Sequence, residues 1–165
     1  TYLAEAIKTI RATNPTRTII VGPASWNGMS SLPTLKLSAD DRNIIVTVHY
    51  YLPMNFTHQG AAWSKETAHL SGVTWGTDAE VATLQADFRK ADQWSKDNRR
   101  PLFLGEFGAY DKAPMESRLR YISTAARTAE SLGWAWGYWQ FDSDFILYDM
   151  AKDQWVDPIL KALIP

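Results

Sequence analysis

The sequence contains no cysteine among its 165 residues. Disulfide bonds and thiolate metal sites are therefore excluded, and the composition does not indicate the redox state of the compartment. Histidine is also scarce. The only three, His49, His58 and His69, are not spaced like metal ligands, so the sequence predicts no metal site and no cofactor.

The sequence also lacks an excess of charge of either sign. Lys and Arg number 17 and Asp and Glu 18, which gives a formal net charge of -1. This balance offers no electrostatic reason to expect a nucleic-acid or membrane partner. No apolar run approaches the length needed to cross a bilayer. The remaining composition, 45% hydrophobic and 21% charged, is typical of one globular domain with a substantial core.

Aromatic residues are the one excess, with eight tryptophans and seven tyrosines. Such side chains serve either as core or as platforms for flat ligands, and only their positions can decide between the two.

Apolar periodicity and turn residues predict four strands that alternate with helices or crossovers. We expect strands at residues 18–21, 44–48, within 101–110 and at 134–141, and helices over 3–14, 77–97, 114–133 and 156–163. Residues 24–41 hold at most a short helical piece, and the long connection 52–76 is more often functional than idle. The alternation predicts an α/β fold with a parallel sheet, and with no internal linker we take residues 1–165 as a single unit.

The stretch Pro101 to Tyr110 places a carboxylate at the end of an apolar run. The run reads as a strand buried on both faces, and Glu106 follows it at the edge where (β/α) barrels place their chemistry. Gly105 and Gly108 allow tight backbone bends and close approach of a ligand. From this stretch alone, we give equal weight to two roles for Glu106: a functional role, and a structural role in which it pairs with a cation.

The carboxyl ends of the four expected strands carry a set of polar and aromatic side chains: Trp26 and Asn27, His49 and Tyr51, Glu106, and Trp139. Residues two apart on a strand face the same way, so His49 and Tyr51 can point into one site. A carboxylate oriented by an imidazole and a hydroxyl suits attack on an acetal carbon. Each member alone is more simply read as core; their joint occurrence favours a site.

Three segments resemble strands six, seven and eight of family 5 glycoside hydrolases, which are (β/α)8 cellulases and related β-glycanases. They are Val-Thr-Val-His-Tyr-Tyr (46–51), Leu-Gly-Glu-Phe-Gly (104–108) and Gly-Tyr-Trp-Gln-Phe (137–141). Residues 18–27 resemble strand five and its loop. The resemblance covers nearly the whole chain, with the strands in the family's order.

The resemblance implies roles for individual residues. Glu106 corresponds to the nucleophile of a retaining mechanism, and His49 and Tyr51 to the His-x-Tyr pair beside it, with the Tyr51 hydroxyl donating to the nucleophile. Trp139 corresponds to the tryptophan that floors the sugar subsite at the cleavage point. Further substrate contacts are assigned to loop residues, first Trp26, Asn27 and Trp63, then less directly Tyr50 and Trp75.

The family's general acid/base, the Glu of an Asn-Glu pair after strand four, has no counterpart in this sequence. A complete (β/α)8 barrel needs about 250 residues, so the chain is similar to the C-terminal half of the enzyme, opening in the helix after strand four. Retaining hydrolysis needs two carboxylates roughly 5–5.5 Å apart. We therefore expect the chain alone to be inactive, or nearly so, on cellulose.

Four open parallel strands leave two unpaired edges and one uncovered face. A homodimer that closes an eight-stranded barrel would cover them. Three interpretations stay open: a fragment of a retaining endo-β-1,4-glucanase, a half-barrel self-assembly module, and a non-catalytic carbohydrate-binding domain. The resemblance implies a cellulose or β-glucan oligosaccharide as partner and an extracellular parent enzyme; it does not separate cellulose from mannan, xyloglucan or mixed-linkage glucan.

Overall fold

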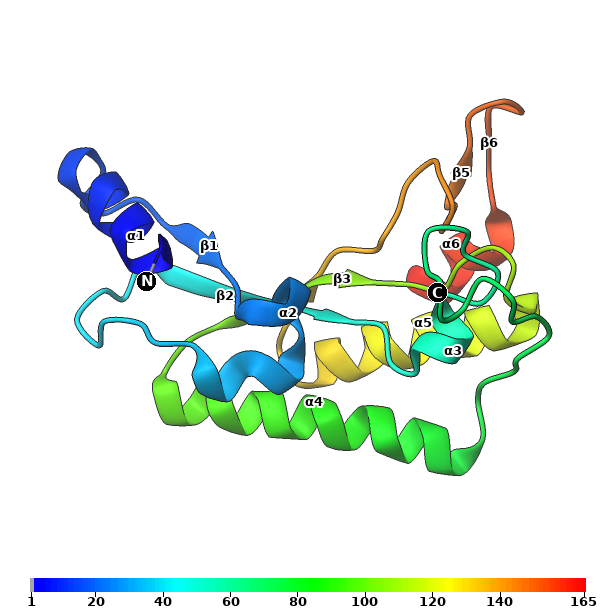
Figure 1. Ribbon diagram of the computed structural model, residues 1–165, viewed down its shortest axis with the longest axis horizontal. Coiled ribbons are helices and arrows are strands. Elements are labelled where there is room, and N and C mark those ends of the chain that lie inside the picture. The colour runs from blue at the N-terminus through cyan, green and yellow to red at the C-terminus, as the bar shows by residue number, and fades with distance from the viewer. Residues whose placement is uncertain (1) are drawn as a thin grey trace.

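The computed structural model describes residues 2–165, and its centre is one four-stranded sheet (Figure 1). The strands are β1 (Ile19–Val21), β2 (Ile44–Tyr50), β3 (Leu102–Phe107) and β4 (Ala135–Trp136). Their order across the sheet is β1-β2-β3-β4, and every neighbouring pair is parallel. The expected α/β fold with four parallel strands in sequence order is therefore confirmed.

Two long helices, α4 (Asp78–Asn98) and α5 (Met115–Ser131), lie along one face of the sheet (Figure 1). Alternate residues of β2 are buried against them, from Ile44 to Tyr50, while the residues between them are only half-buried. The ring of Phe88 on α4 contacts both Tyr50 and Trp134, with centroids 5.1 and 5.5 Å away. The core thus lies between the sheet and this helix pair.

The opposite face of the sheet is covered less completely than the sequence predicts. An apolar run such as β3 indicates burial on both faces, yet only every second residue, for example Leu102 and Leu104, is fully buried. Phe103 on the other face stays half-buried, and Ile20 of β1 is 57% exposed. Among residues 2–165, no helix layer comparable to α4 and α5 packs there (Figure 1).

Helix α4 begins as its sequence predicts. The Thr77 hydroxyl accepts from the backbone N–H of Glu80, and the Glu80 carboxylate accepts from the backbone N–H of Thr77. This reciprocal pair satisfies donors that the first helical turn leaves free. The helix ends at Asn98, where Arg99 adopts a left-handed conformation with φ 51°.

The N-terminal helix α1 (Tyr2–Thr13) packs beside β1 and has no fully buried residue (Figure 1). Its main anchor is Arg11, whose Nε lies 2.7 Å from the Asp41 carboxylate. The guanidinium also donates to the backbone oxygens of Arg17 and Asn43. One side chain thus ties the helix to the segments that enter β1 and β2.

The fourth strand is shorter than residues 134–141. After Trp136 the chain still bonds to β3, since Gly137 N–H donates to Leu104 and Trp139 N–H to Phe107, but it is no longer regular. The rings of Trp136 and Tyr138 both pack edge-on against Phe107. Residues two apart point to the same side of an extended chain, so both rings reach Phe107 although the segment after Trp136 is no longer a regular strand.

The remaining elements are short. Residues 24–41 contain α2 (Ala24–Asn27) and the 3-10 helix η1 (Met29–Thr34), and the long connection 52–76 contains α3 (Met54–Thr57). A hairpin of β5 (Tyr148–Asp149) and β6 (Gln154–Trp155), which the sequence reading did not anticipate, precedes the terminal helix α6 (Asp157–Leu163). Figure 1 shows this hairpin projecting away from the sheet.

Candidate active site

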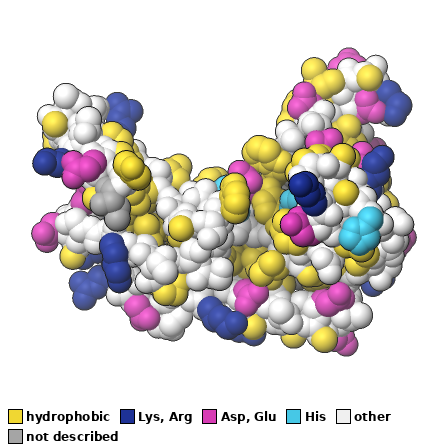
Figure 2. Space-filling view, viewed as in Figure 1, with side chains coloured by type: hydrophobic (Ala, Val, Ile, Leu, Met, Phe, Trp, Pro, Cys, Tyr) yellow, Lys and Arg dark blue, Asp and Glu magenta, His cyan; other side chains and the backbone are white. Residues whose placement is uncertain are grey.

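A cleft of about 1220 Å³ opens where the parallel strands end. Figure 2 shows the molecule hollowed between the α1 end and the β5–β6 end, with hydrophobic side chains gathered along the hollow. Its lining includes eight of the nine residues that the sequence assigns to the site, namely Trp26, Asn27, His49, Tyr50, Tyr51, Trp63, Glu106 and Trp139. Residues up to 113 positions apart in the chain thus share one cavity because the carboxyl ends of parallel strands meet at one edge.

Glu106 is held by two neighbours on β2 and the loop after it. The Tyr51 hydroxyl donates to Oε2 of Glu106 at 2.9 Å, and Nδ1 of His49 lies 3.3 Å from the same oxygen. Among residues 2–165, no hydrogen bond reaches the other oxygen, Oε1. The carboxylate therefore has one anchored oxygen and one that is free to react.

An irregularity in the β2–β3 pairing creates this geometry. Val48 pairs with Leu104, but the next residue, His49, pairs with Glu106, so Gly105 is the extra residue of a bulge. A Cβ atom on Gly105 would collide with Oγ1 of Thr47. Glycine at this position lets β3 turn its carboxylate toward His49.

The ring of Tyr51 is fixed from two sides. His58 and Phe145 pack edge-on against it, with ring centroids 5.1 and 5.9 Å away. Burial and the nearby Glu106 carboxylate both raise the pKa of Tyr51, so its hydroxyl keeps its proton and acts as a donor. Burial lowers the pKa of His58. Sequence reasoning missed the role of both neighbours, because each lies in an irregular segment where no periodicity indicates which way a side chain points.

Burial lowers the pKa of His49, and the Glu106 carboxylate acts in the opposite sense. The other ring nitrogen, Nε2, lies 3.2 Å from Nδ2 of Asn27. Asn27, which the resemblance predicts as a substrate contact, therefore lines the cleft with its amide engaged by a site residue.

Four of the five predicted aromatic contacts, Trp26, Tyr50, Trp63 and Trp139, line the cleft, and all of them except Tyr50 are exposed. Trp26 is 92% exposed, and Trp63 and Trp139 are also exposed. Trp75 is different: it is 4% exposed, does not line the cleft, and packs against Phe56 and Tyr121. Its assignment to substrate binding is wrong, because its ring fills the space between α3 and α5.

Tyr50 is likewise a packing residue. Its ring is 3% exposed and rests on Phe88, and its hydroxyl donates to the carboxylate of Asp87 at 3.1 Å. Adjacent strand residues point to opposite faces, so the ring of Tyr50 packs toward α4, at a part of the cleft lining away from Glu106, while His49 and Tyr51 point to Glu106.

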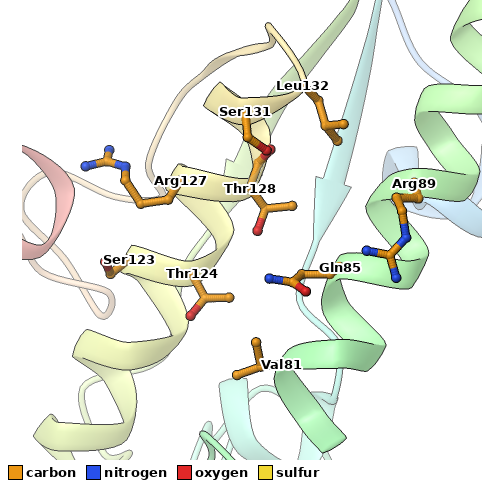
Figure 3. A pocket seen from close by; sticks show the side chains of 9 residues that line it. All are labelled: Val81, Gln85, Arg89, Ser123, Thr124, Arg127, Thr128, Ser131 and Leu132. Carbon is orange, nitrogen blue, oxygen red and sulfur yellow. The ribbon is translucent and has the colours of Figure 1, made fainter. Parts of the chain in front are cut away.

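A second hollow lies between α4 and α5 on the outer surface (Figure 3). Arg89 and Gln85 reach it from α4, and small hydroxyl residues such as Thr128 from α5. None of its nine lining residues is Asp, Glu or His. Hydrolysis of an acetal needs a carboxylate or an equivalent acid, so this hollow is no candidate for that chemistry.

Within residues 2–165, no three His, Asp or Glu side chains come together in a way that could hold a metal ion. No helix in that range combines the length and the apolar character that crossing a bilayer requires.

Comparison with known proteins links this geometry to one family. The family model described as cellulase (glycosyl hydrolase family 5) matches residues 1–144. Among curated proteins, Endoglucanase H of Acetivibrio thermocellus is 32% identical over 163 residues, which is 95% of this chain and 17% of that protein. Endoglucanase 3 of Fibrobacter succinogenes is 27% identical and matches 88% of this chain and 27% of its own length.

Solved structures share this fold. Clostridial cellulose synthase subunit Z from Clostridioides difficile superposes with a TM-score of 0.95 at 40% identity over 99% of this chain. Thermotoga maritima Cel5A, solved with cellobiose, gives a TM-score of 0.95 at 42% identity over 98%. The match covers 55% and 53% of those two chains, so this chain spans about half of each.

Proposed function

Because the chain belongs to the cellulase family, glycosyl hydrolase family 5, we propose that it supplies the nucleophile side of a retaining endoglucanase. One observation carries the proposal: the Tyr51 hydroxyl donates to Oε2 of Glu106, and Nδ1 of His49, which can carry a proton, lies 3.3 Å from the same oxygen in the cleft. Such donors hold the carboxylate ionised and oriented, as a nucleophile requires.

In the proposed reaction, Oε1 of Glu106 attacks the anomeric carbon of a β-glucan unit. A new ester bond forms between this carbon and Glu106 while the glycosidic bond breaks, and the leaving oxygen takes a proton from a general acid. Water then attacks the same carbon and gives a proton to the conjugate base of that general acid, while the ester bond breaks, so that the sugar is released and Glu106 returns to its carboxylate form. The exposed face of Trp139 offers a stacking surface for the sugar ring.

The general acid is the part that this chain does not supply in the proposal. The other carboxylates that line the cleft are Glu66, Asp87 and Asp144. Asp87 accepts from Tyr50 and pairs with Lys90, and Glu66 extends from the exposed surface of the long connection. Loss of general acid catalysis costs a factor of about 100 to 10,000, so the chain alone should show little or no turnover of cellulose.

We further propose that residues 1–165 form one half-barrel unit that self-associates. Strand β1 would pair with β4 of a second copy at both seams and close an eight-stranded barrel. Two observations support this arrangement: the side chain of Ile20 is exposed, and the outer edges of β1 and β4 pair with no further strand within residues 2–165. In such a dimer the two Glu106 residues would face each other across the mouth, which does not rebuild the retaining pair.

The alternative function is therefore a self-assembly module with at most residual glycan binding. The substrate class in either case is a β-glucan or cellulose oligosaccharide, and the proposed setting is extracellular, as the resemblance implies. The proposal includes no cofactor.

A substrate that needs no protonated leaving group tests the nucleophile directly. Dinitrophenyl 2-fluoro-cellobioside releases a stable phenolate, so attack by Glu106 proceeds without the general acid, and the fluorine slows the following hydrolysis. We expect a burst of one phenolate per chain and a matching mass increase on the peptide that contains Glu106. Glu106→Gln should give no burst, whereas Glu116→Gln, an exposed glutamate of α5, should retain it. If the unaltered chain shows no burst, the proposed role of Glu106 as a nucleophile is wrong.

Mixing the chain with the part of Thermotoga maritima Cel5A that it does not match separates the two functions. Recovery of β-glucan hydrolysis that depends on Glu106 supports the nucleophile role in a complete barrel. Glycan binding without any recovery supports the module.

A further inference from the structure

The side chain of Asn27 lies in a space that the end of β1 keeps free for it. A Cβ atom built on Gly22 would lie 2.5 Å from Cγ of Asn27 and closer still to Oδ1. Any side chain at position 22 would therefore displace the Asn27 amide. The φ of Gly22 is not in the left-handed range, so glycine is required here for space and not for backbone conformation.

The backbone that presents Asn27 is strained. Three consecutive residues that are not glycine, Ser25, Trp26 and Asn27, have φ of 56°, 51° and 60°. This left-handed region is unfavourable for ordinary side chains and is least so for asparagine. A parallel bridge between Gly28 and His49 fixes the end of the turn next to β2. Strain that persists in one turn beside a cleft points to a positional requirement.

The amide of Asn27 ends a chain of three polar groups. Its Nδ2 lies 3.2 Å from Nε2 of His49, and Nδ1 of the same ring lies 3.3 Å from Oε2 of Glu106. His49 is thus placed between an amide on one side and a carboxylate on the other.

The proton positions follow from the chemistry of the two ends. An amide NH₂ group only donates, so Nε2 of His49 must accept and carries no proton. The remaining proton of the neutral ring is then on Nδ1, which faces a carboxylate that only accepts. With the opposite tautomer, an amide N–H would point at a ring N–H and a ring lone pair at the carboxylate, which is repulsive at both ends.

The reversed amide is the one other arrangement that satisfies all groups. If Oδ1 of Asn27 faced the ring, Nε2 would carry a proton and His49 would be an imidazolium that donates at both ends. The ring is only 15% exposed in its side chain, and burial disfavours that charge. The neutral ring with its proton on Nδ1 is the form that fits the cleft.

We propose that Asn27 is a positioning residue that fixes the tautomer of His49, so that the ring N–H is directed at Glu106. Asn27 acts through His49 and does not touch the reacting atoms. The inference deepens the proposed function, because it explains how one oxygen of the nucleophile is held while the other stays free. The role given to this tautomer rests on the proposed function, but the tautomer itself is expected without substrate and can be measured independently.

Proton–nitrogen correlation spectra of the chain with nitrogen-labelled histidine measure the tautomer directly. At about pH 7.5, above the ordinary histidine pKa, we expect the ring of His49 to show the pattern of a neutral ring protonated on Nδ1. The His49→Gln spectrum assigns the signal among the three histidines. A ring protonated on Nε2 alone, or a charged ring, in the unaltered chain would overturn the proposal.

Two substitutions at position 27 should change the protonation pattern of His49 in different ways. Asn27→Leu removes the donor, and the Nδ1-protonated pattern should be lost or mixed with the other tautomer. Asn27→Asp places an acceptor at Nε2, and the ring should become protonated there. Asn55→Leu, an exposed asparagine of α3 outside the cleft lining, is the matched control and should leave the His49 signal unchanged. Persistence of the original pattern in both position-27 variants would contradict the proposal.

Gly22→Ala tests the same arrangement without changing any polar group. The added methyl group should displace the Asn27 amide and weaken the Nδ1-protonated pattern, as Asn27→Leu does. Backbone amide spectra show whether each variant is folded, and a variant that is not folded leaves the decision to the unaltered chain and Asn27→Asp. A correct tautomer with no phenolate burst would refute the proposed function alone; a burst with the wrong tautomer would refute this inference alone.

Discussion

Burial sets the protonation states of single residues around Glu106. It raises the pKa of Tyr51, where the carboxylate acts in the same sense, and lowers the pKa of His49 and His58. Tyr51 therefore stays a donor, and both imidazoles favour their neutral form. A hydroxyl and a neutral imidazole can each give a hydrogen bond to a carboxylate without neutralising it, which is the state a nucleophile needs.

His49 and His58 make stability depend on pH. Their folded pKa lies below the ordinary value of about 6.5, so the unfolded chain binds protons first as pH falls. The free energy of unfolding should therefore decline as pH drops from about 6.5 to about 5, before carboxylates titrate. In His58→Phe, which keeps a ring against Tyr51, we expect a shallower decline in urea unfolding experiments.

A core substitution without a titratable group serves as the control for this pH effect. Ile122→Val on α5, at a fully buried position, should lower the free energy of unfolding by about 0.5–1.5 kcal/mol at every pH. Its dependence on pH should match that of the unaltered chain. Equal slopes for His58→Phe and the unaltered chain would contradict the assigned burial of His58.

At the scale of an element, helix α4 shows how local sequence and packing together determine where a helix forms. Its capping box lies in adjacent residues, and its buried face repeats at helical spacing from Leu84 to Phe88 and Ala91. Both signals are local in sequence, which is why the start of this helix could be predicted. The end at Asn98 lies within one residue of the predicted end at 97 and coincides with the left-handed conformation of Arg99.

The cap of α4 can be tested by paired substitutions in one helix. Thr77→Ala removes the side chain that accepts from Glu80 N–H and should cost about 0.5–2 kcal/mol of stability. Thr83→Ala changes the same residue type in the exposed interior of α4, where the effect should stay within about 0.5 kcal/mol. Thermal or urea unfolding measures both, and equal losses would show that the cap has no special weight.

Strand β4 shows where local reading fails for an element. The run from Trp134 to Phe141 has the composition of a strand, yet only Ala135–Trp136 is regular. The side chains after it are placed by contacts with distant residues: Tyr138 by Phe107 and by the backbone oxygen of Phe145. The composition of a segment indicates that it can pair as a strand. The contacts it makes with its neighbours determine how many of its residues form regular strand.

At the scale of the whole molecule, the main feature is that, among residues 2–165, the outer edges of β1 and β4 pair with no further strand and one face of the sheet is less covered. The two long helices cover one face, and Ile20 on the other is 57% exposed (Figure 1). An exposed apolar strand edge favours association with another chain. The proposed dimer would use this face and both edges.

Light scattering tests the association. We expect twice the monomer mass for the unaltered chain and a shift toward the monomer for Ile20→Lys, which would place a charge on the buried face of the closed barrel. Ile164→Lys introduces the same change at an exposed position after α6 and should keep the dimer. A monomeric unaltered chain, or equal masses for the two variants, would contradict the proposed dimer.

The sequence by itself determined the four parallel strands, the helices between them and the residues that reach the cleft. It could do so because period and turn chemistry are local, and because parallel strands bring their carboxyl ends to one edge whatever the details. Only the tertiary structure decided what each side chain does there. The bulge at Gly105, the burial of Trp75 and the contact from Asn27 to His49 depend on distances between residues far apart in sequence. Such distances are set by packing in three dimensions, which no local pattern encodes.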